Sequence, residues 1–264
     1  MRPNQELADT AIVDTGLDRA ERPLITVVAV CFNHAPYVQE CLNSIAAQTF
    51  MDFELIVTDD ASKDNSPQLI TDWLSASKMG GQFIRHTFNR GLCKTLNEAL
   101  AAASGRYIAM IATDDRWHPN RLEVHVDYLR QINAKDAILY SDARTMDAHG
   151  TILSNSFICN ARHGFVPPSG DIFDALADGN FIPAMTVLIP TDALRAVGGY
   201  DESLTYEDYD MWLRLAAAGY PFEFVPATLA DYRILGNSLV RTLNSRLSAD
   251  HLYTQCCIRL KWIG

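Results

Sequence analysis

The sequence lacks the features that mark several classes of protein. Its six cysteines form no CxxC pair and no Cys/His ligand spacing, and their neighbours are apolar. No stretch approaches the roughly 20 apolar residues of a membrane-spanning helix, and the segment Met1 to Arg22 has no apolar core of signal-peptide length. These absences predict reduced core thiols, no zinc site and no disulfides, as is typical of a protein of the cytoplasm.

A surplus of basic residues is also missing. The chain has 22 Lys and Arg against 32 Asp and Glu, a formal net charge of -10. Nothing basic is concentrated enough to neutralise phosphates, which argues against a nucleic acid or a general anionic membrane surface as partner. What is present is 48% hydrophobic residues in a chain of 264, enough for one sizeable domain or a domain with an appended lobe.

Strand-like and helix-like segments alternate along the chain. The apolar, β-branched run 24–31 predicts a strand buried on both faces of a sheet, and Pro36 is expected to open the following helix as its first residue. A second unit follows, with a strand over 53–58 and a helix capped by Ser66. Further elements are expected over residues 67–75, 83–86, 92–103, 107–112, 120–131, 137–140, 185–189, 191–197, 222–225 and 228–232. The alternation predicts an α/β fold with a doubly wound, mainly parallel sheet, and the aperiodic residues 142–178 are expected to form a substrate-facing loop.

Two of the expected strands end on paired acids, Asp59–Asp60 and Asp114–Asp115. In an open α/β sheet, ligands bind in the crevice beyond the carboxyl ends of the strands, so all four carboxylates are expected on one rim. Crowded carboxylates repel one another and lose hydration, and a divalent metal, the base and ribose of a nucleotide, or both, would satisfy them. The alternative is that these acids only cap turns and helix starts.

A third acidic pair, Glu207–Asp208, is expected in the first turn of a helix, where the helix dipole favours negative charge. Trp212 lies one helical turn beyond Asp208 and therefore on the same face, where its ring could stack on a sugar. The alternatives are an acid pair that only stabilises the helix and a tryptophan of the core.

Five segments in this order resemble the family 2 glycosyltransferases: ITVVAVCFNHAPYVQECLNSIAAQTF, FELIVTDDAS, NRGLCKTLNEALAAASGRYIAMIATDD, VGGYDE and EDYDMWLRLAAAGY. The resemblance runs from about Leu24 to Val240. It implies the GT-A fold, a Rossmann-like sheet with a carboxy-terminal acceptor-side region. It also implies an inverting enzyme that takes a nucleotide-diphospho-sugar as donor and usually Mg²⁺ or Mn²⁺ as cofactor.

The resemblance assigns roles by position. Asp208 matches the catalytic base, and Asp115 matches the acid that binds the metal. Contacts to the nucleotide are implied for Val30, Phe32, Asn33, Asp60, Arg90 and Asp114. Many members carry an acid two positions before Asp114, where this chain has Ala112, so Asp114 is given a supporting role, to the ribose. Residues expected at the substrate are Glu207, Trp212 and Arg233.

The chemistry asks for the same residue types. Displacing a nucleoside diphosphate from an anomeric carbon requires neutralised phosphates, which a metal held by Asp115 would supply. The acceptor hydroxyl must lose its proton as it attacks, and Asp208 is the expected general base; a single displacement then inverts the anomeric configuration. Tyr232, Arg233 and Ser238 resemble a segment that closes over the site in relatives, where Arg233 would meet phosphate unless it forms a surface ion pair.

The sequence therefore predicts a glycosyltransferase of polysaccharide biosynthesis. It would move a sugar from a UDP-, dTDP- or GDP-sugar to the hydroxyl of a saccharide or lipid-linked acceptor. One alternative is a nucleotide-sugar-binding module that has lost catalysis, which Ala112 favours. The other is a nucleotidyltransferase on a related fold, which the absence of a Gly-rich basic loop after the first strand disfavours.

The expected layout has four parts. A flexible tail over 1–23 precedes a nucleotide-sugar-binding half over 24–118, an acceptor-binding and catalytic half over 119–240 and a terminal helix over 241–264. That helix is expected to pack on the domain, with another subunit or a membrane surface as alternatives. The predicted location is the cytoplasm, with peripheral contact to the inner face of the membrane as an open alternative, and the oligomeric state stays open.

Overall fold

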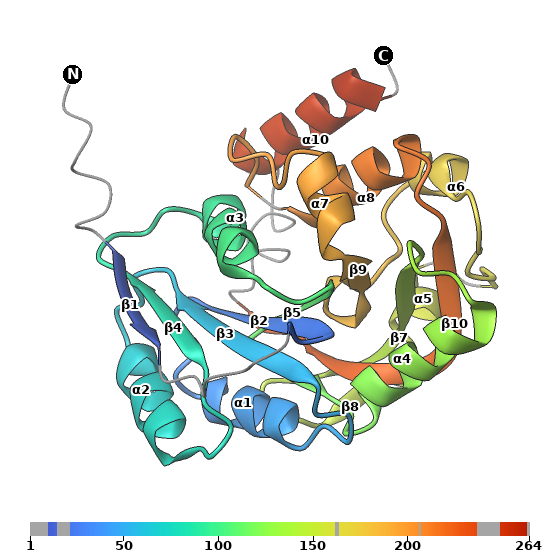
Figure 1. Cartoon of the computed structure of the whole chain (residues 1–264). Helices are drawn as coiled ribbons and strands as arrows, with labels where there is room; N and C mark the ends of the chain where they lie inside the picture. The colour runs from blue at the N-terminus through green and yellow to red at the C-terminus, as the bar shows by residue number, and fades with distance from the viewer. Residues whose placement is uncertain (1–9, 15–21, 162–163, 206, 237–248, 263–264) are drawn as a thin grey trace.

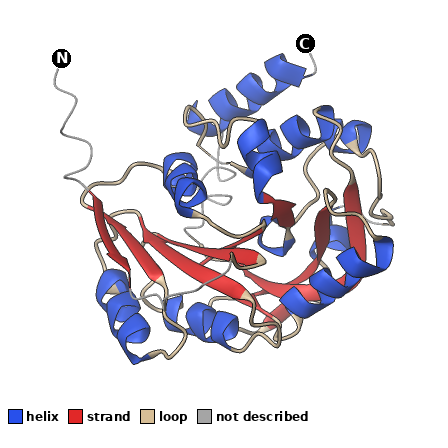
Figure 2. Ribbon diagram, in the orientation of Figure 1, coloured by secondary structure: helices blue, strands red, loops and turns tan. Residues whose placement is uncertain are grey.

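A computed structural model describes residues 10–14, 22–161, 164–205, 207–236 and 249–262. These residues form one mixed sheet with helices on both faces (Figure 1). Helices α1 (Val38–Ala46), α2 (Ser66–Ala76) and α4 (Arg121–Ile132) cover one face, and α3 (Leu92–Ala102), α7 (Thr191–Ala196) and α8 (Asp208–Ala217) cover the other. Figure 2 shows the strands as a layer between the two sets of helices, the arrangement that the alternating pattern predicts.

Four parallel strands build the amino-terminal half of the sheet. They are β2 (Ile25–Cys31), β3 (Phe53–Asp59), β4 (Gln82–His86) and β5 (Tyr107–Ala112). β2 pairs with β3 on one side and β5 on the other, and β4 continues the sheet beyond β3. Every residue of β2 is buried, as expected for a strand covered on both faces. The carboxyl ends of these strands therefore lie along one edge.

The carboxy-terminal half adds strands of mixed direction. They are β6 (Arg116–Trp117), β7 (Ile138–Met146), β8 (Ile152–Ser154), β9 (Leu188–Pro190) and β10 (Phe222–Arg233). With β1 (Thr10–Asp14), the order across the sheet is β1-β4-β3-β2-β5-β9-β7-β10-β6, and β8 pairs with β7. The long pairings, among β2 to β5 and between β7 and β10, are parallel, whereas the short β9 runs antiparallel to β5 and β7. The predicted α/β fold class with a mainly parallel sheet is confirmed.

The two faces of the sheet carry separate hydrophobic cores. One core lies under α1, α2 and α4, and the other lies under α3, α7 and α8. The buried residues of α1 are those that the helical period predicts: Val38, Cys41, Leu42 and Ile45. The remaining elements are the short helices α5 (Phe157–Ala161) and α6 (Phe173–Ala177), the 3₁₀ turn η2 (Ala184–Thr186) and the terminal helix α10 (Ala249–Trp262).

Two helix starts differ from the prediction. Pro36 lies in a turn, and α1 begins two residues later at Val38. Ser66 is the first residue of α2, and its hydroxyl accepts a hydrogen bond from the His34 N–H at 3.0 Å instead of capping the helix. The Ser66 hydroxyl thus joins α2 to the loop after β2, a contact that the pattern of the helix alone does not predict.

The carboxy-terminal half is more regular than predicted. The strand expected over 185–189 is divided between η2 and β9. The strands expected over 222–225 and 228–232 are one strand, β10, whose pairing with β7 shifts register between Val225 and Thr228. The expected loop over 142–178 contains the end of β7 together with β8, α5 and α6.

Part of the expected flexible tail belongs to the sheet. Residues 10–14 form β1, which pairs antiparallel with β4, so that Thr10 lies opposite His86 and Asp14 opposite Gln82. At the other end, α10 packs on the domain through the buried Ile258. The preceding residues 241–248, expected to belong to the same helix, lie outside the described residues.

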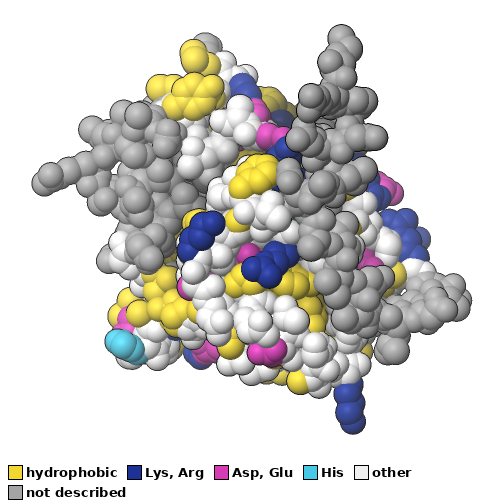
Figure 3. Space-filling view, turned by 90° about the vertical axis from the view of Figure 1, so that its left-hand side faces the viewer, with side chains coloured by type: hydrophobic (Ala, Val, Ile, Leu, Met, Phe, Trp, Pro, Cys, Tyr) yellow, Lys and Arg dark blue, Asp and Glu magenta, His cyan; other side chains and the backbone are white. Residues whose placement is uncertain are grey.

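The described surface is mixed in character. Figure 3 shows hydrophobic side chains interspersed with basic and acidic ones on the face near β1 and β4, as is ordinary for a solvated surface. All six cysteines are free, and the prediction of core thiols is right for three of them, whereas Cys159 and Cys256 are exposed. Among the described helices, none has the length and apolar composition needed to span a bilayer.

Candidate functional site

The predicted nucleotide-contact residues lie at the carboxyl ends of β2, β3 and β5. Val30, near the end of β2, pairs with Thr58 of β3 and Ala112 of β5. Asn33 and Asp60 follow β2 and β3, and the acids at 114 and 115 follow β5. The parallel order of the strands brings these positions to one edge, and their role in binding a nucleotide stays a prediction.

The loops after β2 and β3 are tied together at this edge. The Asn33 N–H donates to the Ser62 hydroxyl at 2.8 Å, and the Asn33 side-chain oxygen accepts the Lys63 N–H at 2.7 Å. Asn33 has φ 59° and Ala61 has φ 60°, a left-handed conformation that non-glycine residues rarely adopt and that concentrates at functional sites. Phe32 beside them is 44% exposed, which leaves its ring available to a ligand.

The Asp60 carboxylate is held by three hydrogen-bond donors. Its Oδ1 lies 2.8 Å from His86 Nδ1 and accepts the Arg90 N–H at 2.7 Å, and its Oδ2 accepts the Gly91 N–H at 3.0 Å. Burial alone would raise the pKa of Asp60, but these hydrogen bonds outweigh burial and hold the pKa below its usual value. Asp60 is therefore ionised and fixed in orientation before any ligand binds.

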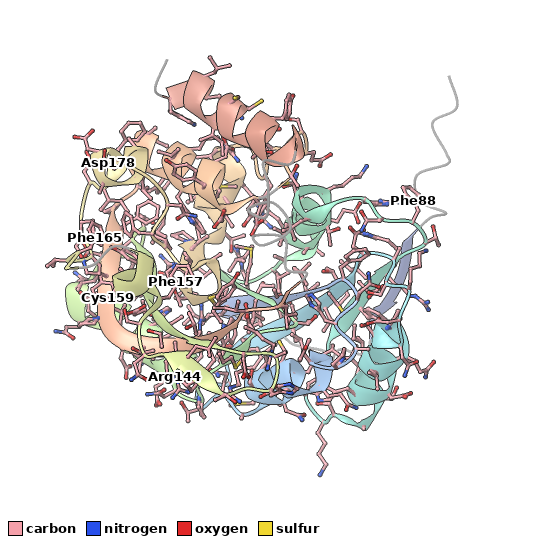
Figure 4. All side chains as sticks on the ribbon, turned by 180° about the vertical axis from the view of Figure 1, so that it is seen from behind. Phe88, Arg144, Phe157, Cys159, Phe165 and Asp178 are labelled. Atoms are coloured by element: carbon pink, nitrogen blue, oxygen red, sulfur yellow. The ribbon has the colours of Figure 1, made fainter. Side chains whose placement is uncertain are left out.

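Arg90 reaches this site through its backbone. Its guanidinium contacts Glu98, with Nη1 2.5 Å from Oε1, and stacks over the Phe88 ring at 5.2 Å (Figure 4 labels Phe88). The Arg90 side chain is only 8% exposed. Arg90 therefore holds Asp60 through its backbone N–H, and the predicted contact of this residue with a nucleotide stays a prediction.

Asp115 is buried beside Asp114. Its Oδ1 accepts the Arg233 N–H at 2.7 Å, and burial together with the charge of Asp114 raises its pKa well above the usual value. Asp114 Oδ2 lies 3.7 Å from His34 Nε2. In the described part of the chain, no three His, Cys, Asp or Glu side chains form a ready metal cage. A cation held here would take one or two carboxylates and complete its shell with ligand oxygens, as Mg²⁺ does with phosphates.

Arg233 is a buried structural residue. Its side chain is 2% exposed, with Nη2 2.5 Å from Glu40 Oε2, and its Nε donates to the Asp114 carbonyl at 2.7 Å. The guanidinium also lies 4.5 Å from the centre of the Tyr37 ring. The expected phosphate contact is not supported, because the guanidinium is buried and its donors anchor the loop that carries the two acids. The alternative of an ion pair is met by Glu40, although the Arg233 side chain is buried and not on the surface.

Asp231, two residues before Arg233 in β10, also holds the segment that follows the two acids. It accepts hydrogen bonds from Arg116 Nε at 2.5 Å and Arg144 Nε at 2.6 Å, and it lies 3.1 Å from His118 Nε2 (Figure 4 labels Arg144). Burial raises its pKa, but the partners outweigh burial and hold the pKa far below the usual range. The segment that follows Asp115 is thereby fixed to β7 and β10.

Glu207 and Asp208 stand at the start of α8, as predicted. Glu207 is the N-cap residue, and Asp208 Oδ2 accepts the Asn180 side-chain N–H at 2.8 Å. Burial and the charge of Asp208 raise the pKa of Glu207 to about 8, and burial raises the pKa of Asp208. Within the described residues neither acid forms an ion pair. An acid with a raised pKa and a fixed orientation is suited to accept a proton.

Tyr232 of β10 has a raised pKa. Burial of its phenol is the main cause, and the charges of four carboxylates, those of Asp115, Asp114, Asp208 and Glu207, raise the pKa further. The charges of both acidic pairs thus act on one phenol. The Phe157 ring packs edge-on against Tyr232 with centroids 5.5 Å apart (Figure 4 labels Phe157).

Trp212 lies in the hydrophobic core. Its ring is fully buried, and it packs edge-on against Phe222 with centroids 6.5 Å apart in the core beneath α8. The expected stacking on a sugar is therefore wrong, and the alternative, a core residue, is right. The helical period places Trp212 near Asp208 along the axis, but the sheet determines which way the side chain points.

A hollow of about 870 Å³ lies away from the acids. Its lining includes Arg106, Lys135, Asp136, Asp192 and Tyr220, at the amino ends of β5, β7 and β10. None of the site residues predicted from the sequence lines it. Ligands of open α/β sheets bind at the carboxyl ends of strands, so the chemistry is assigned to the acidic rim.

Three residues of the site escaped the sequence analysis. His86 and Glu98 surround Asp60, and Asn180 orients Asp208. Their hydrogen-bonded partners are 26, 12 and 28 residues away in the chain. No local spacing reports such pairings, because they arise only when the strands and helices have packed.

Comparisons with known proteins bear on the family. The family model described as Glycosyl transferase family 2 matches residues 26–174, and that described as Glycosyl transferase family group 2 matches residues 155–244. An uncharacterized glycosyltransferase of Rickettsia prowazekii is 29% identical over 86% of this chain and 68% of its own length. A putative teichuronic acid biosynthesis glycosyltransferase of Bacillus subtilis is 26% identical over 83% of this chain and 82% of its own. The chain spans 31% of a longer relative from Rickettsia conorii.

Solved structures share the fold. A fragment of S. aureus TarS has a TM-score of 0.67 at 18% identity, over 89% of this chain and 65% of its own. A mannosyltransferase from Pyrobaculum calidifontis has a TM-score of 0.62 at 18% identity, over 94% of this chain and 73% of its own. The expected GT-A fold is confirmed. Since the first family model covers more than half of the chain, this protein belongs to glycosyl transferase family 2.

Proposed function

We propose that the protein transfers a sugar from a nucleotide-diphospho-sugar to an acceptor hydroxyl with inversion at the anomeric carbon. The observation that carries this proposal is the presence of two oriented acidic pairs, one after β5, where Asp115 accepts the Arg233 N–H, and one at the start of α8, where Asn180 donates to Asp208. Asp114–Asp115 come from the strand edge, and Glu207–Asp208 come from the start of α8. One pair would serve the leaving diphosphate and the other the attacking hydroxyl.

On the donor side, the ionised and fixed Asp60 would accept a hydrogen bond from the nucleotide base. The fold neighbours support a nucleotide-sugar donor, because the TarS fragment was solved with UDP-GlcNAc and the mannosyltransferase with GDP-Man and Mn²⁺. These two donors differ in base and sugar. We therefore keep UDP-, dTDP- and GDP-sugars as candidate donors.

The residues present fit a divalent cation at the diphosphate. Asp115 is buried beside Asp114 and its pKa is raised, a penalty that a cation between the two carboxylates would remove. Asp115 is the proposed metal ligand, and Asp114 beside it keeps its proposed supporting role toward the ribose. When bound, Mg²⁺ or Mn²⁺ would neutralise charge on the leaving diphosphate.

On the acceptor side, Asp208 would act as the general base. The acceptor oxygen forms its bond to the anomeric carbon and gives its proton to the Asp208 carboxylate, while the bond to the diphosphate breaks on the opposite face. Asn180 holds Asp208 Oδ2 at 2.8 Å, which keeps the base in one orientation.

The acceptor is proposed to be a saccharide or a lipid-linked saccharide. Relatives named for teichuronic acid biosynthesis and for chondroitin synthesis support a role in polysaccharide assembly. We place the reaction in the cytoplasm, with peripheral membrane contact where the acceptor is lipid-linked. Sedimentation with anionic vesicles at low salt tests that contact, and a protein that stays in the supernatant contradicts it.

Two experiments test the proposed function. Thermal shifts with UDP, dTDP, GDP, CDP and ADP, each with and without Mn²⁺, should show a selective, metal-dependent rise for one diphosphate. With the matching sugar nucleotide, D208N should lower the rate of nucleotide release by about 10²–10⁴-fold without weakening nucleotide binding. The control D192N removes a carboxylate that is 86% exposed and should act like the parent.

Each outcome has a distinct meaning. Equal rates in D208N and the parent would show that Asp208 is not the base. Selective nucleotide binding without turnover in the parent would favour the alternative of an inactive nucleotide-sugar-binding module. No response to any of the five diphosphates would contradict the proposed donor altogether.

A further inference from the structure

The His86 imidazole lies between two carboxylates at the end of β4. Its Nδ1 is 2.8 Å from Asp60 Oδ1, its Nε2 is 2.7 Å from Glu98 Oε2, and its side chain has no exposed surface. An ionised carboxylate can only accept hydrogen bonds, and a neutral imidazole has a single N–H to donate. Both contacts form together only when the ring carries both protons or when one carboxyl is protonated.

Both carboxyls have hydrogen-bond donors besides His86. Asp60 accepts two backbone N–H groups in addition to His86, and Glu98 Oε1 lies 2.5 Å from Arg90 Nη1. The second proton is therefore assigned to the ring, which becomes an imidazolium. Burial alone would lower the pKa of His86, but the hydrogen bonds and charges of the two carboxylates outweigh burial and raise it.

The charges of this cluster balance only when His86 is protonated. The imidazolium and Arg90 carry two positive charges, and Asp60 and Glu98 carry two negative charges. Asp60 reaches the ring from the end of β3, Glu98 reaches it from α3, and Arg90 acts through Glu98 from the loop between β4 and α3. If His86 loses a proton, one of the two carboxylates faces a ring nitrogen that no longer donates, which is costly beside a fully buried ring.

The cluster also sets which oxygen of Asp60 can meet a ligand. Oδ1 accepts two hydrogen bonds, from His86 and from the Arg90 N–H, whereas Oδ2 accepts one, from Gly91. A carboxylate oxygen has two lone pairs, so Oδ2 keeps capacity for one more donor. Rotation of the carboxylate would break the bond from the imidazolium, so His86 keeps Oδ2 available.

We propose that His86, as an imidazolium, is a positioning residue for donor binding, holding Asp60 ready for the nucleotide base and making donor affinity fall as the ring loses its proton. This inference rests on the proposed function, because it assigns a pH response to the same donor site. The direction follows from the raised pKa of His86. The productive, protonated form exists below that pKa and is lost as the pH rises through it.

Two substitutions separate the two ends of the ring. The amide nitrogen of H86N takes the place of Nδ1, so it can donate to Asp60 at any pH. The amide nitrogen of H86Q takes the place of Nε2 and can reach only Glu98. The matched control is H149N, which changes an exposed histidine and should keep the pH profile of the parent.

The test measures the dissociation constant of the diphosphate that gives the largest thermal shift, with Mn²⁺, between about pH 6 and pH 9. The parent and H149N should lose about 10-fold or more in affinity over this range, the size expected for one charge-assisted hydrogen bond. H86N should stay within about 3-fold of the parent at low pH and lose the pH step, and H86Q should bind about 10-fold more weakly at every pH.

A second variant covers the case in which the substitutions at 86 prevent folding. E98Q keeps an oxygen that accepts the Nε2 proton but removes one negative charge, so it should move the pH step to lower pH. A flat profile in the parent, parent-like binding in H86Q or an unmoved step in E98Q would each overturn the role of His86 while leaving donor binding intact. Absence of binding of all five diphosphates to the parent would overturn both this inference and the proposed function.

Discussion

Asp60 follows β3 and Asp115 follows β5 at the same edge of the sheet, yet their pKa values are shifted in opposite directions. Asp60 is surrounded by the His86 ring and two backbone N–H groups, and its pKa is lowered. Asp115 accepts a single N–H from Arg233, lies against the charge of Asp114, and has a raised pKa. One acid is satisfied within the protein, and the other is not.

The difference separates a structural role from a binding role among the acids of this fold. The Asp60 cluster is complete in the absence of a ligand, so it lends rigidity to the edge and presents a fixed acceptor. Asp115 and Glu207, in contrast, have raised pKa values, so keeping either of them ionised costs stability and creates affinity for a cation or a proton. Sites of catalysis commonly break the rules that the rest of a fold obeys.

The largest expected effect comes from D115N. Loss of the charge that would hold the cation should lower turnover by about 10³-fold and abolish the Mn²⁺-dependent thermal shift. Without metal, the variant should melt at the same temperature as the parent or higher, because the repulsion from Asp114 is relieved. Parallel steady-state assays and thermal melts check this, and full activity with an intact Mn²⁺ response would contradict it.

The opposite stability effect is expected for D60N. The loss of one charge-assisted hydrogen bond should weaken binding of the nucleoside diphosphate by about 10–150-fold. The variant should also melt at lower temperature, by about 2–4 °C per kcal/mol lost, because the buried His86 ring loses its counter-charge. Calorimetric titration and thermal melts give both quantities. A D60N protein as stable as the parent would remove the contrast with Asp115.

A pH-dependent effect is expected at the second acidic pair. The pKa of Glu207 rises from 4.5 to about 8, so the folded protein keeps a proton that the unfolded chain releases. The free energy of unfolding should therefore fall as the pH rises between these two values. Urea unfolding of the parent and E207Q across this range tests the sign, since the variant should show a shallower decline. An identical decline in both proteins would contradict the assignment.

The smallest effect is expected for Y232F. This change removes only the phenol hydroxyl, on which the charges of both acidic pairs act, and keeps the ring that packs on Phe157. Turnover should fall by about 2–10-fold, the size of one neutral hydrogen bond, and the melting temperature should stay close to that of the parent. A loss as large as that of D115N would mean that the phenol takes a direct part in proton transfer.

The fold could be predicted where the signals are local. β2, α1, β3 and α2 lie within a few residues of the expected positions, because buried parallel strands and amphipathic helices leave clear periods in the sequence. The prediction failed where strand pairing determines which residues form a strand. The apolar run at 185–189 is divided between η2 and the three-residue β9, which lies between β5 and β7. β10 continues through Pro226 by means of a register shift.

The candidate site could likewise be predicted only where the signals are local. Paired acids after strands are visible in the sequence, and the structure brings them to the expected edge. The direction of a long side chain is not visible, so Trp212 and Arg233 were assigned to the substrate although packing places both in the interior. The His86 cluster was missed for a related reason, because its members meet only in the folded chain.

The antiparallel pairing of β1 with β4 has a consequence for handling the protein. Without Thr10–Asp14, the N–H and C=O groups of β4 that now pair with β1 would lie bare along its outer side. Bare strand edges recruit further strands from other molecules and promote aggregation. A chain shortened to begin at Pro23 should therefore self-associate at concentrations where the full chain does not, and light scattering would detect this. Thr10–Asp14 thus help to keep the protein monodisperse by covering the edge of β4.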